Sequence, residues 1–186
     1  QTKEIVGANV YNRAFNSSYT GGDAKELCAT DHPSPAGTWS NELNPAADLS
    51  ENALEDLVTQ IYSATDDNGL KISLQPKSLI VSASDWFEAN RIVKSVLQND
   101  SPNNAINVLK ATNVFPDGIK LNHFLTDTDA FFVRTNCPDG LKCLSRRPVR
   151  FAEDHDFDTA NLKYKADERY AMGWTDPRGL YASSGA

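Results

Sequence analysis

LKYKADERYAMGW, residues 162–174, carries the clearest secondary-structure pattern in the sequence. Every second side chain, starting at Leu162 and ending at Trp174, is mostly apolar, and the side chains between them are mostly charged. A period of two places alternate side chains on opposite faces of a β-strand. At about 3.3 Å per residue such a strand would be roughly 40 Å long, about twice the usual length. The pattern therefore predicts a long strand with one buried face, which suits an elongated protein better than a compact enzyme.

The sequence around this strand predicts a mixed α/β or α+β fold, of which α+β is preferred. Turn residues from Thr175 to Gly179 end the strand, and a short tail of small residues follows. An amphipathic helix is expected to end near residue 15, with irregular chain over 16–48. Ser50 and Ser84 are the expected N-caps of two helices with apolar residues at helical spacing. Short strands are predicted at 79–81, 106–109, 119–125 and 130–134, and a polar loop at 99–104.

The composition is that of an ordinary globular chain with an acidic balance. The 186 residues carry a formal net charge of −7, and 40% of them are hydrophobic, so the chain can bury a real core. The sequence contains no run of about 18 apolar residues, so it predicts no membrane span. The densest basic stretch is only Arg146, Arg147 and Arg150, which argues against a dedicated nucleic-acid-binding module. A weakly acidic surface would lie beside DNA without gripping it.

Two further features bear on the chain's history and redox state. Gln1 is not an initiator methionine, which indicates a processed or truncated product. The three cysteines are an odd number and do not indicate a disulfide framework. Cys137 and Cys143 flank a Pro-Asp-Gly turn and could face each other across a hairpin. Reduced thiols are nevertheless the preferred interpretation, also for Cys28.

One acidic run, from Glu153 to Asp158, encloses His155 and raises the alternative of a divalent cation site. Neighbouring side chains of an extended loop point in different directions, so they would not converge on one ion. No H-E-x-x-H or EF-hand spacing is present, and His32 and His123 are distant in sequence. No G-x-S-x-G elbow surrounds a serine. A solvated acidic turn is favoured, and a metal-dependent hydrolase stays open as a remote alternative.

The end of the chain resembles the ending of tailed-phage major capsid proteins. Those proteins often close with an acidic D-x-D-T/S turn, a long K-x-K/R-x-R-Y strand and a G-W-x-D-P-R-G turn. Residues 156–186 follow this order. Four further segments resemble the same family, in one order along the chain. They are NVYNRAFNSSYTGG at 9–22, HPSPAGTWSN at 32–41, and the segments 79–97 and 125–133.

This resemblance implies the Hong Kong 97 phage capsid fold, with a compact mixed α/β axial domain and an elongated peripheral domain built on a spine helix and long strands. Residues 1–75 would hold the end of the spine helix, the irregular loop and a peripheral-domain helix. Residues 76–148 would form the axial domain, and residues 149–186 would return to the peripheral domain. The family's extended loop and N-terminal arm would precede residue 1.

The resemblance also implies a subunit that is not an enzyme and needs no cofactor or metal. Copies of it would assemble into hexamers and pentamers of an icosahedral shell, in the host bacterial cytoplasm, with scaffold and portal proteins and in some phages decoration proteins. The shell would enclose double-stranded DNA without binding it specifically, and no membrane partner is expected. A bacterial nanocompartment shell protein of the same fold is the nearest alternative.

Nine side chains are the expected subunit-interface residues. Arg146 and Arg147 could form ion pairs with the acidic run, within or between subunits. Surface charge without a partner is an equally favoured interpretation, and phosphate binding is less favoured. The loop 99–104 and the turn 138–142 are expected to be tips of the axial domain. The full set is Arg146, Arg147, Asp154, Asp156, Trp39, Asn103, Asp139, Trp174 and Arg178.

Overall fold

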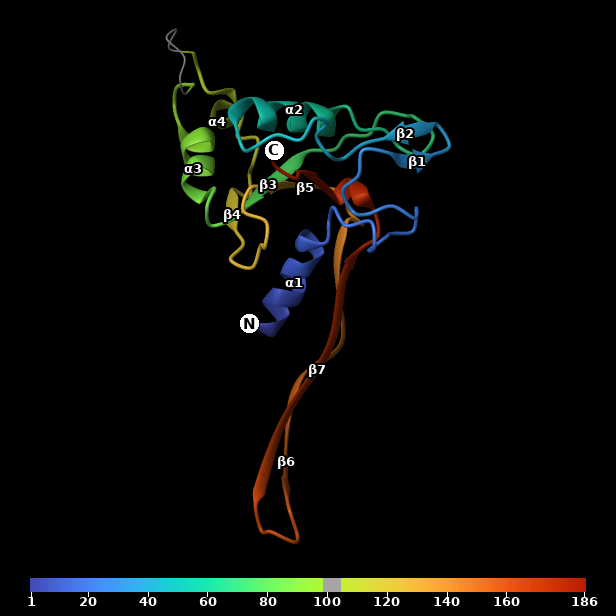
Figure 1. The fold of residues 1–186 in the computed structure, drawn as a ribbon, viewed down its shortest axis with the longest axis vertical. Coiled ribbons are helices and arrows are strands. Elements are labelled where there is room, and N and C mark those ends of the chain that lie inside the picture. The colour runs from blue at the N-terminus through green and yellow to red at the C-terminus, as the bar shows by residue number, and fades with distance from the viewer. Residues whose placement is uncertain (99–104) are drawn as a thin grey trace.

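The computed structural model describes residues 1–98 and 105–186. The chain forms a body built on a four-stranded sheet and a long two-stranded ribbon that leaves this body (Figure 1). The sheet has the order β4-β3-β5-β8, with β3 parallel to β4 and the other pairs antiparallel. The predicted mixture of helices and strands is confirmed. The strands of the sheet are β3 (Pro76–Val81), β4 (Ile119–Leu121), β5 (Phe131–Thr135) and β8 (Leu180–Ser183).

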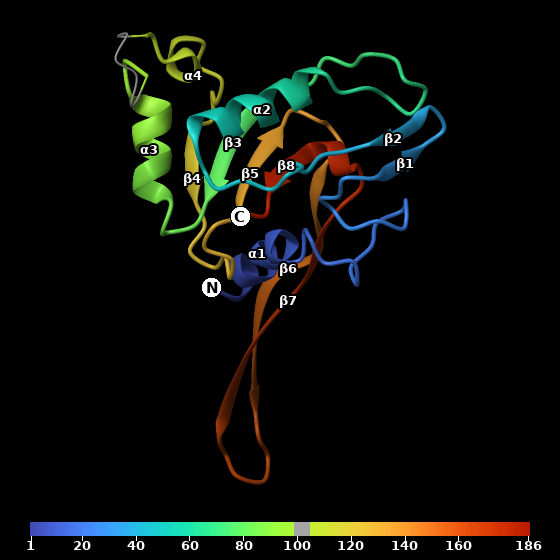
Figure 2. The same cartoon turned by 45° about the horizontal axis from the view of Figure 1, so that its top comes forward.

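Alternate residues of the sheet face two separate hydrophobic cores, on opposite sides (Figure 2). Val133 faces the core covered by helix α2 (Glu51–Tyr62), and the neighbouring Phe132 faces the core beside helix α1 (Thr2–Asn12). The rings of Tyr11 and Phe15 pack on Phe132, with centroid distances of 5.3 and 5.7 Å. Since both faces are covered, the central strands are buried along most of their length.

The helix expected after Ser50 is confirmed. The Ser50 side chain accepts a hydrogen bond from the Ala53 amide, and this satisfies one of the free N–H groups of the first turn. Leu54, Leu57 and Ile61 are fully buried against the sheet. The helix expected over residues 1–15 is shorter, Thr2–Asn12, and it buries Ala8 while Ile5 stays 40% exposed.

Three local predictions are wrong. Ser84 does not cap helix α3 (Trp86–Lys94), because the turn preceding the helix extends to Asp85, whose amide bonds to the Ser82 hydroxyl at 3.4 Å. The strand expected at 106–109 is instead the one-turn helix α4 (Val108–Ala111), begun by the Asn107 side chain, which accepts from the Lys110 amide. The strand expected to reach residue 125 ends at Leu121, since Asn122 closes a local turn by accepting from the Phe124 amide.

The regions expected to be irregular contain more structure than the sequence showed. The segment 16–48 includes a small hairpin of β1 (His32–Ser34) and β2 (Gly37–Trp39). The expected turn after the long strand is confirmed and includes the 3₁₀ helix η1 (Pro177–Gly179). The first four residues of the tail that follows form β8 and are buried, and the last three residues, 184–186, lie beyond this strand. The predicted loop 99–104, with Asn103, lies outside the described residues.

The long strand is confirmed with the predicted bounds, as β7 (Leu162–Trp174). Its partner β6 (Leu141–His155) was missed. The first half of the acidic run, 153–155, forms the outer end of this strand, and the second half, 156–158, lies in the turn between the two strands. The prediction of one buried face is wrong for the outer half of the ribbon. There both strands are exposed, because they extend beyond the body and no other element of the described chain covers them (Figure 1).

Candidate assembly surface

The ribbon of β6 and β7 is irregular on one strand only. Its pairs run from Leu141 opposite Trp174 to His155 opposite Leu162. The register shifts between Ser145 and Arg147 and again between Arg147 and Arg150, each time with one extra residue on β6. Such bulges bend a strand and increase its twist. Pro148 lies in the second of them and cannot donate a backbone hydrogen bond, so β6 is bent where β7 stays regular.

One side of the ribbon packs on helix α1 where the ribbon joins the body. Lys3 donates to Glu168 at 2.8 Å and lies 5.1 Å from the centre of the Tyr170 ring. Gly7 leaves room for Met172, whose Sδ would be 3.2 Å from a Cβ at that position. These β7 residues alternate along the strand, and therefore they define the side of the ribbon that faces α1.

The same side continues outward without a cover. Ala166, Tyr164 and Leu162 follow at the same alternation, and Phe151 lies directly opposite Ala166 on β6. We call these four residues the outer apolar face. Phe151 is 82% exposed and Tyr164 is 74% exposed. Aromatic side chains contribute most when they are buried at an interface, so this surface is suited to a contact that the single chain does not make.

The opposite side of the ribbon carries an arginine clamp. Asp167 Oδ2 accepts from Arg147 at 2.6 Å, and its Oδ1 accepts from Arg150 at 3.0 Å. The hydrogen bond from Arg147, and to a smaller extent the one from Arg150, holds the pKa of Asp167 below its ordinary value. Arg169 lies directly opposite Arg147. The clamp therefore joins the two strands where β6 is bent, and it leaves an excess of positive charge.

Acidification is expected to loosen the middle of the ribbon through Asp167. Because folding lowers the pKa of this carboxyl, its contribution is complete above the ordinary Asp value of about 4 and is lost as the pH falls through the lowered pKa. We therefore compare amide exchange of residues 147–150 in the wild-type protein and in an Asp167→Asn variant at the same series of pH values. As the pH falls, the ratio of the wild-type exchange rate to that of the variant should rise. Identical pH profiles for the two proteins would contradict this role.

The ion pairs of the acidic run differ from the prediction. Asp156 pairs with Lys163 at 2.6 Å, across the turn that joins the two strands. The hydrogen bond from the Lys163 ammonium, and to a smaller extent the one from the Thr159 hydroxyl, lowers the pKa of Asp156. Asp154 accepts from the amide of His155. The expected pairing of Arg146 and Arg147 with this run is wrong within the chain, since Arg147 bonds to Asp167.

Four of the predicted interface residues come together at the base of the ribbon. A cavity of about 400 Å³ is lined there by Trp39, Asp139, Trp174 and Arg178. Arg178 is 8% exposed, donates to Thr65 O at 2.9 Å and to Asp67 at 2.7 Å, and lies 4.4 Å from the centre of the Trp39 ring. Arg178 and Trp39 thus position the loops around the ribbon base.

A buried polar cluster that the sequence did not reveal lies beside this base. The Asn41 amide donates to Leu27 O at 2.7 Å and to Leu180 O at 2.9 Å. Its oxygen accepts from the Ala29 amide and from His32 Nε2, each at 2.9 Å. His32 Nδ1 faces Asp23 at 2.6 Å, so both ring nitrogens lie within hydrogen-bonding distance of side-chain oxygen atoms.

This polar cluster gives a physical reason for the string HPSPAGTWSN. His32 and Asn41 are its first and last polar residues, and they bond to each other across the β1–β2 hairpin. Trp39 stacks on the His32 ring at 4.6 Å. In the sequence, only the spacing of His32 and Asn41 pointed to this cluster. That spacing does not show which carbonyl groups of distant segments Asn41 binds.

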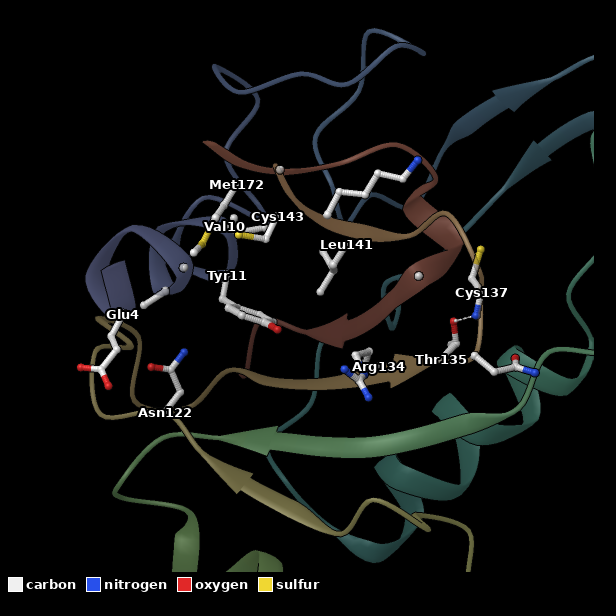
Figure 3. Close-up of a pocket in the computed structure, with 16 residues that line it drawn as sticks. Glu4, Val10, Tyr11, Asn122, Arg134, Thr135, Cys137, Leu141, Cys143 and Met172 are labelled. Carbon is white, nitrogen blue, oxygen red and sulfur yellow. Dashed lines mark hydrogen bonds between the residues drawn. The ribbon is translucent and has the colours of Figure 1, made fainter. Parts of the chain in front are cut away.

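A cavity of about 650 Å³ lies between α1, β5 and the start of the ribbon (Figure 3). Tyr11, Leu141 and Met172 form its apolar wall, and Glu4 and Arg134 lie at its edges. No group of three or more metal-ligating side chains occurs among residues 1–98 and 105–186. Cys28, Cys137 and Cys143 are free thiols, as preferred from the sequence. Within the described chain, no helix is long and apolar enough to span a membrane.

Three solved structures are similar to this chain over part of their length. A virus-like particle from Pyrococcus furiosus shares 13% identity, with a TM-score of 0.47 and coverage of 76% of this chain and 55% of that one. A Mycobacterium phage Che8 structure shares 18% identity, with a TM-score of 0.44 and coverage of 78% and 54%. A phage-related protein from Bordetella bronchiseptica RB50 shares 12% identity, with a TM-score of 0.44 and coverage of 72% and 50%.

The chain thus spans about half the length of these solved structures. No curated protein matches it. A family model described as "Phage capsid protein" matches residues 4–183, and therefore includes the sheet, both cores and the whole ribbon. Since this match extends over almost all of the sequence, the chain belongs to the phage capsid protein family.

Proposed function

We propose that this chain is part of the major capsid protein of a tailed phage, the structural subunit that forms an icosahedral shell around double-stranded DNA. The single observation that carries the proposal is the family match over residues 4–183. The form of the molecule supports it, because a body with a projecting ribbon offers surfaces to several neighbours at once (Figure 1). Subunits of closed shells need many such contacts, each of them of moderate strength.

The proposal includes the Hong Kong 97 fold and its division into domains. Residues 76–148 would be the axial domain, and residues 1–75 with 149–186 would be the peripheral domain, with α1 as the end of its spine helix. The contact of α1 with the start of the ribbon supports this grouping, since it joins the first and last parts of the sequence. Hexamers and pentamers would form in the host cytoplasm with scaffold and portal proteins.

The proposed interface lies along the ribbon and around its base. Arg146, Arg147, Asp154 and Asp156 are exposed or half-buried side chains of the ribbon, where neighbouring subunits could reach them. Asp139 lies at the base and pairs with Lys142 at 2.9 Å. Trp39, Trp174 and Arg178 would act by shaping the base from within, because their side chains are mostly engaged in the chain's own contacts.

The role proposed for the subunit is structural and not catalytic. The acidic surface that the net charge of −7 provides would keep packaged DNA from adhering to the shell. The three histidines are spread over the molecule, with His32 buried in the Asn41 cluster and His155 at the outer end of the ribbon. Neither position resembles an enclosed reaction site.

The test is assembly of the full-length gene product, alone and co-expressed with a candidate scaffold protein. Sedimentation velocity and negative-stain microscopy should show rings or closed shells of uniform diameter. Nuclease-resistant double-stranded DNA inside particles recovered from infected cells would support the phage role. Enclosed protein cargo would favour a nanocompartment instead. Persistent monomers under both expression conditions would contradict the proposal.

A further inference from the structure

The middle of the ribbon carries a patch of positive charge that the order of residues in the sequence does not reveal. Strand pairing places Arg169 directly opposite Arg147, and Asp167 directly opposite Arg150. Residues that lie opposite each other on paired strands point to the same side of the ribbon, and so do residues two apart on one strand. Lys165 therefore shares this side. We call Arg147, Arg150, Lys165 and Arg169 the arginine face.

The positive charge of this side is only partly balanced. Asp167 Oδ2 accepts from Arg147 at 2.6 Å, and its Oδ1 accepts from Arg150 at 3.0 Å. Among residues 1–98 and 105–186, no carboxylate forms an ion pair with Lys165 or Arg169. Four positive side chains and one carboxylate leave a formal excess of three positive charges.

The arrangement is unfavourable without an anion. Arg147 and Arg169 are paired in register, so their Cβ atoms are about 4.5–5.5 Å apart, and like charges placed directly opposite each other destabilise a pair of strands. The side chains of Arg147 and Arg150 are 45% and 59% exposed, and Arg169 is exposed as well. An anion from solution can therefore reach these guanidinium groups and relieve the repulsion.

We propose that the arginine face binds phosphate groups of double-stranded DNA. The inference rests on the proposed function, which places this DNA beside the subunit. Guanidinium groups bind phosphate through paired hydrogen bonds, and arginine is preferred where this geometry matters. A two-stranded ribbon is also one of the elements that the major groove of B-DNA accommodates, and this ribbon projects from the body (Figure 1).

A protein partner fits this side less well than DNA does. Stable protein contacts have an apolar centre with aromatic anchors, and the exposed aromatic residues Phe151 and Tyr164 lie on the other side of the ribbon. The neighbour of the arginine face on β6 is Ala152, a small side chain opposite Lys165. The patch therefore offers charge without an apolar centre, which suits a phosphate backbone.

The contact with DNA is expected to be weak and local. The formal net charge of the chain is −7, so most of its surface repels phosphate. Toward the tip of the ribbon, Asp154 lies opposite Lys163, and Asp156 pairs with the same lysine at 2.6 Å. The arginine face would thus hold a few phosphates without reading bases, because contacts to phosphate carry no sequence information.

The experiment measures the DNA affinity of the full-length protein before assembly, by fluorescence anisotropy with a labelled duplex at several salt concentrations. Each neutralised phosphate contributes about −0.9 to the slope of log affinity against log salt concentration, so a slope of about −3 is expected. Lys165→Gln with Arg169→Gln removes two charges that form no ion pair within the described chain. The slope of this double variant should change to about −1, and its affinity at low salt should fall at least about tenfold.

Lys71→Gln with Lys110→Gln is the matched control. Both lysines are exposed on the body, and the change in net charge is the same as in the first double variant. The control should keep the wild-type slope and affinity. Melting temperature and circular dichroism check that all three proteins have the same fold.

A smaller slope in the Lys165 and Arg169 variant alone supports the proposal, and equal slopes in the three proteins contradict it. Saturable binding of inorganic phosphate at constant ionic strength, with no binding of DNA, would identify a free anion as the ligand and overturn the choice of DNA. A variant that binds DNA like the wild type but fails to assemble would show that the face serves a protein partner instead.

The proposed function is tested separately, by assembly of the wild-type protein. If that protein forms shells but shows no DNA binding through the arginine face, the contact is wrong and the shell function stands. If it binds DNA as expected but never assembles, the shell function is wrong and the contact stands.

Discussion

Replacing Asn41 by alanine is expected to lower the free energy of unfolding by about 3–5 kcal/mol, a large part of the usual stability of a domain. The Asn41 amide is completely buried and binds the carbonyl oxygens of Leu27, Pro177 and Leu180. Alanine would leave these acceptors, together with the Ala29 amide and the His32 ring, without their partner. Urea or guanidinium unfolding of the wild-type and variant proteins measures the difference.

The Asn41→Asp variant separates hydrogen bonding from packing. Aspartate has the same shape, but it would turn an acceptor oxygen toward three carbonyl oxygens, so it should destabilise at least as strongly as alanine. Asn161→Ala is the control, because Asn161 is exposed in the ribbon turn and bonds only to Thr159 within its own loop through its side chain. A stable Asn41→Asp protein would contradict the assigned pattern of donors and acceptors.

Replacing Gly179 by alanine is expected to cost about 3 kcal/mol, at the upper end of the range for overpacked sites. A Cβ on Gly179 would lie 2.5 Å from Gly140 Cα, and a Cβ on Gly140 would lie 2.7 Å from Gly179 Cα. The two turns at the base of the ribbon approach each other at these glycines. Since the obstacle is backbone and not a flexible side chain, the turns would have to separate.

Gly173→Ala is the matched control for this site. Gly173 is also near the base of the ribbon, and a Cβ there would meet nothing within 4 Å. Its melting temperature should stay within about a degree or two of the wild type, as for a surface substitution. If Gly179→Ala were equally harmless, the close approach of the two turns would not contribute to how the ribbon is anchored.

The parts of the fold that the sequence revealed are those with a strong local pattern. The period of two over 162–174 predicted β7 to the residue, and the cap at Ser50 predicted helix α2. Strand β6 was missed because its bulges interrupt the alternation around Pro148, so that its residues look like a loop. Strand β8 was missed because its four residues, LYAS, are too few to carry a pattern of their own, and pairing with β5 decides its conformation.

The surface could be predicted less well than the fold. Trp39, Asp139, Trp174 and Arg178 do share one site, but this follows from contacts between distant segments, such as that of Arg178 with Thr65. The ion-pair partner of Arg147 was placed in the acidic run, whereas the pairing of the strands brings Asp167 to it. The apolar face of β7 was read as buried. Its period reveals a face, but the period does not say whether this chain or another one covers it.

The central claim is that the chain is part of a subunit that assembles into a shell, so that the exposed ribbon should become less accessible on assembly. The direct measurement is backbone amide exchange of residues 149–166 by mass spectrometry, in the unassembled and in the assembled full-length protein. Fast exchange before assembly and strong protection afterwards is the predicted result, with α2 protected in both states. Equal exchange of residues 149–166 in the two states would contradict the claim.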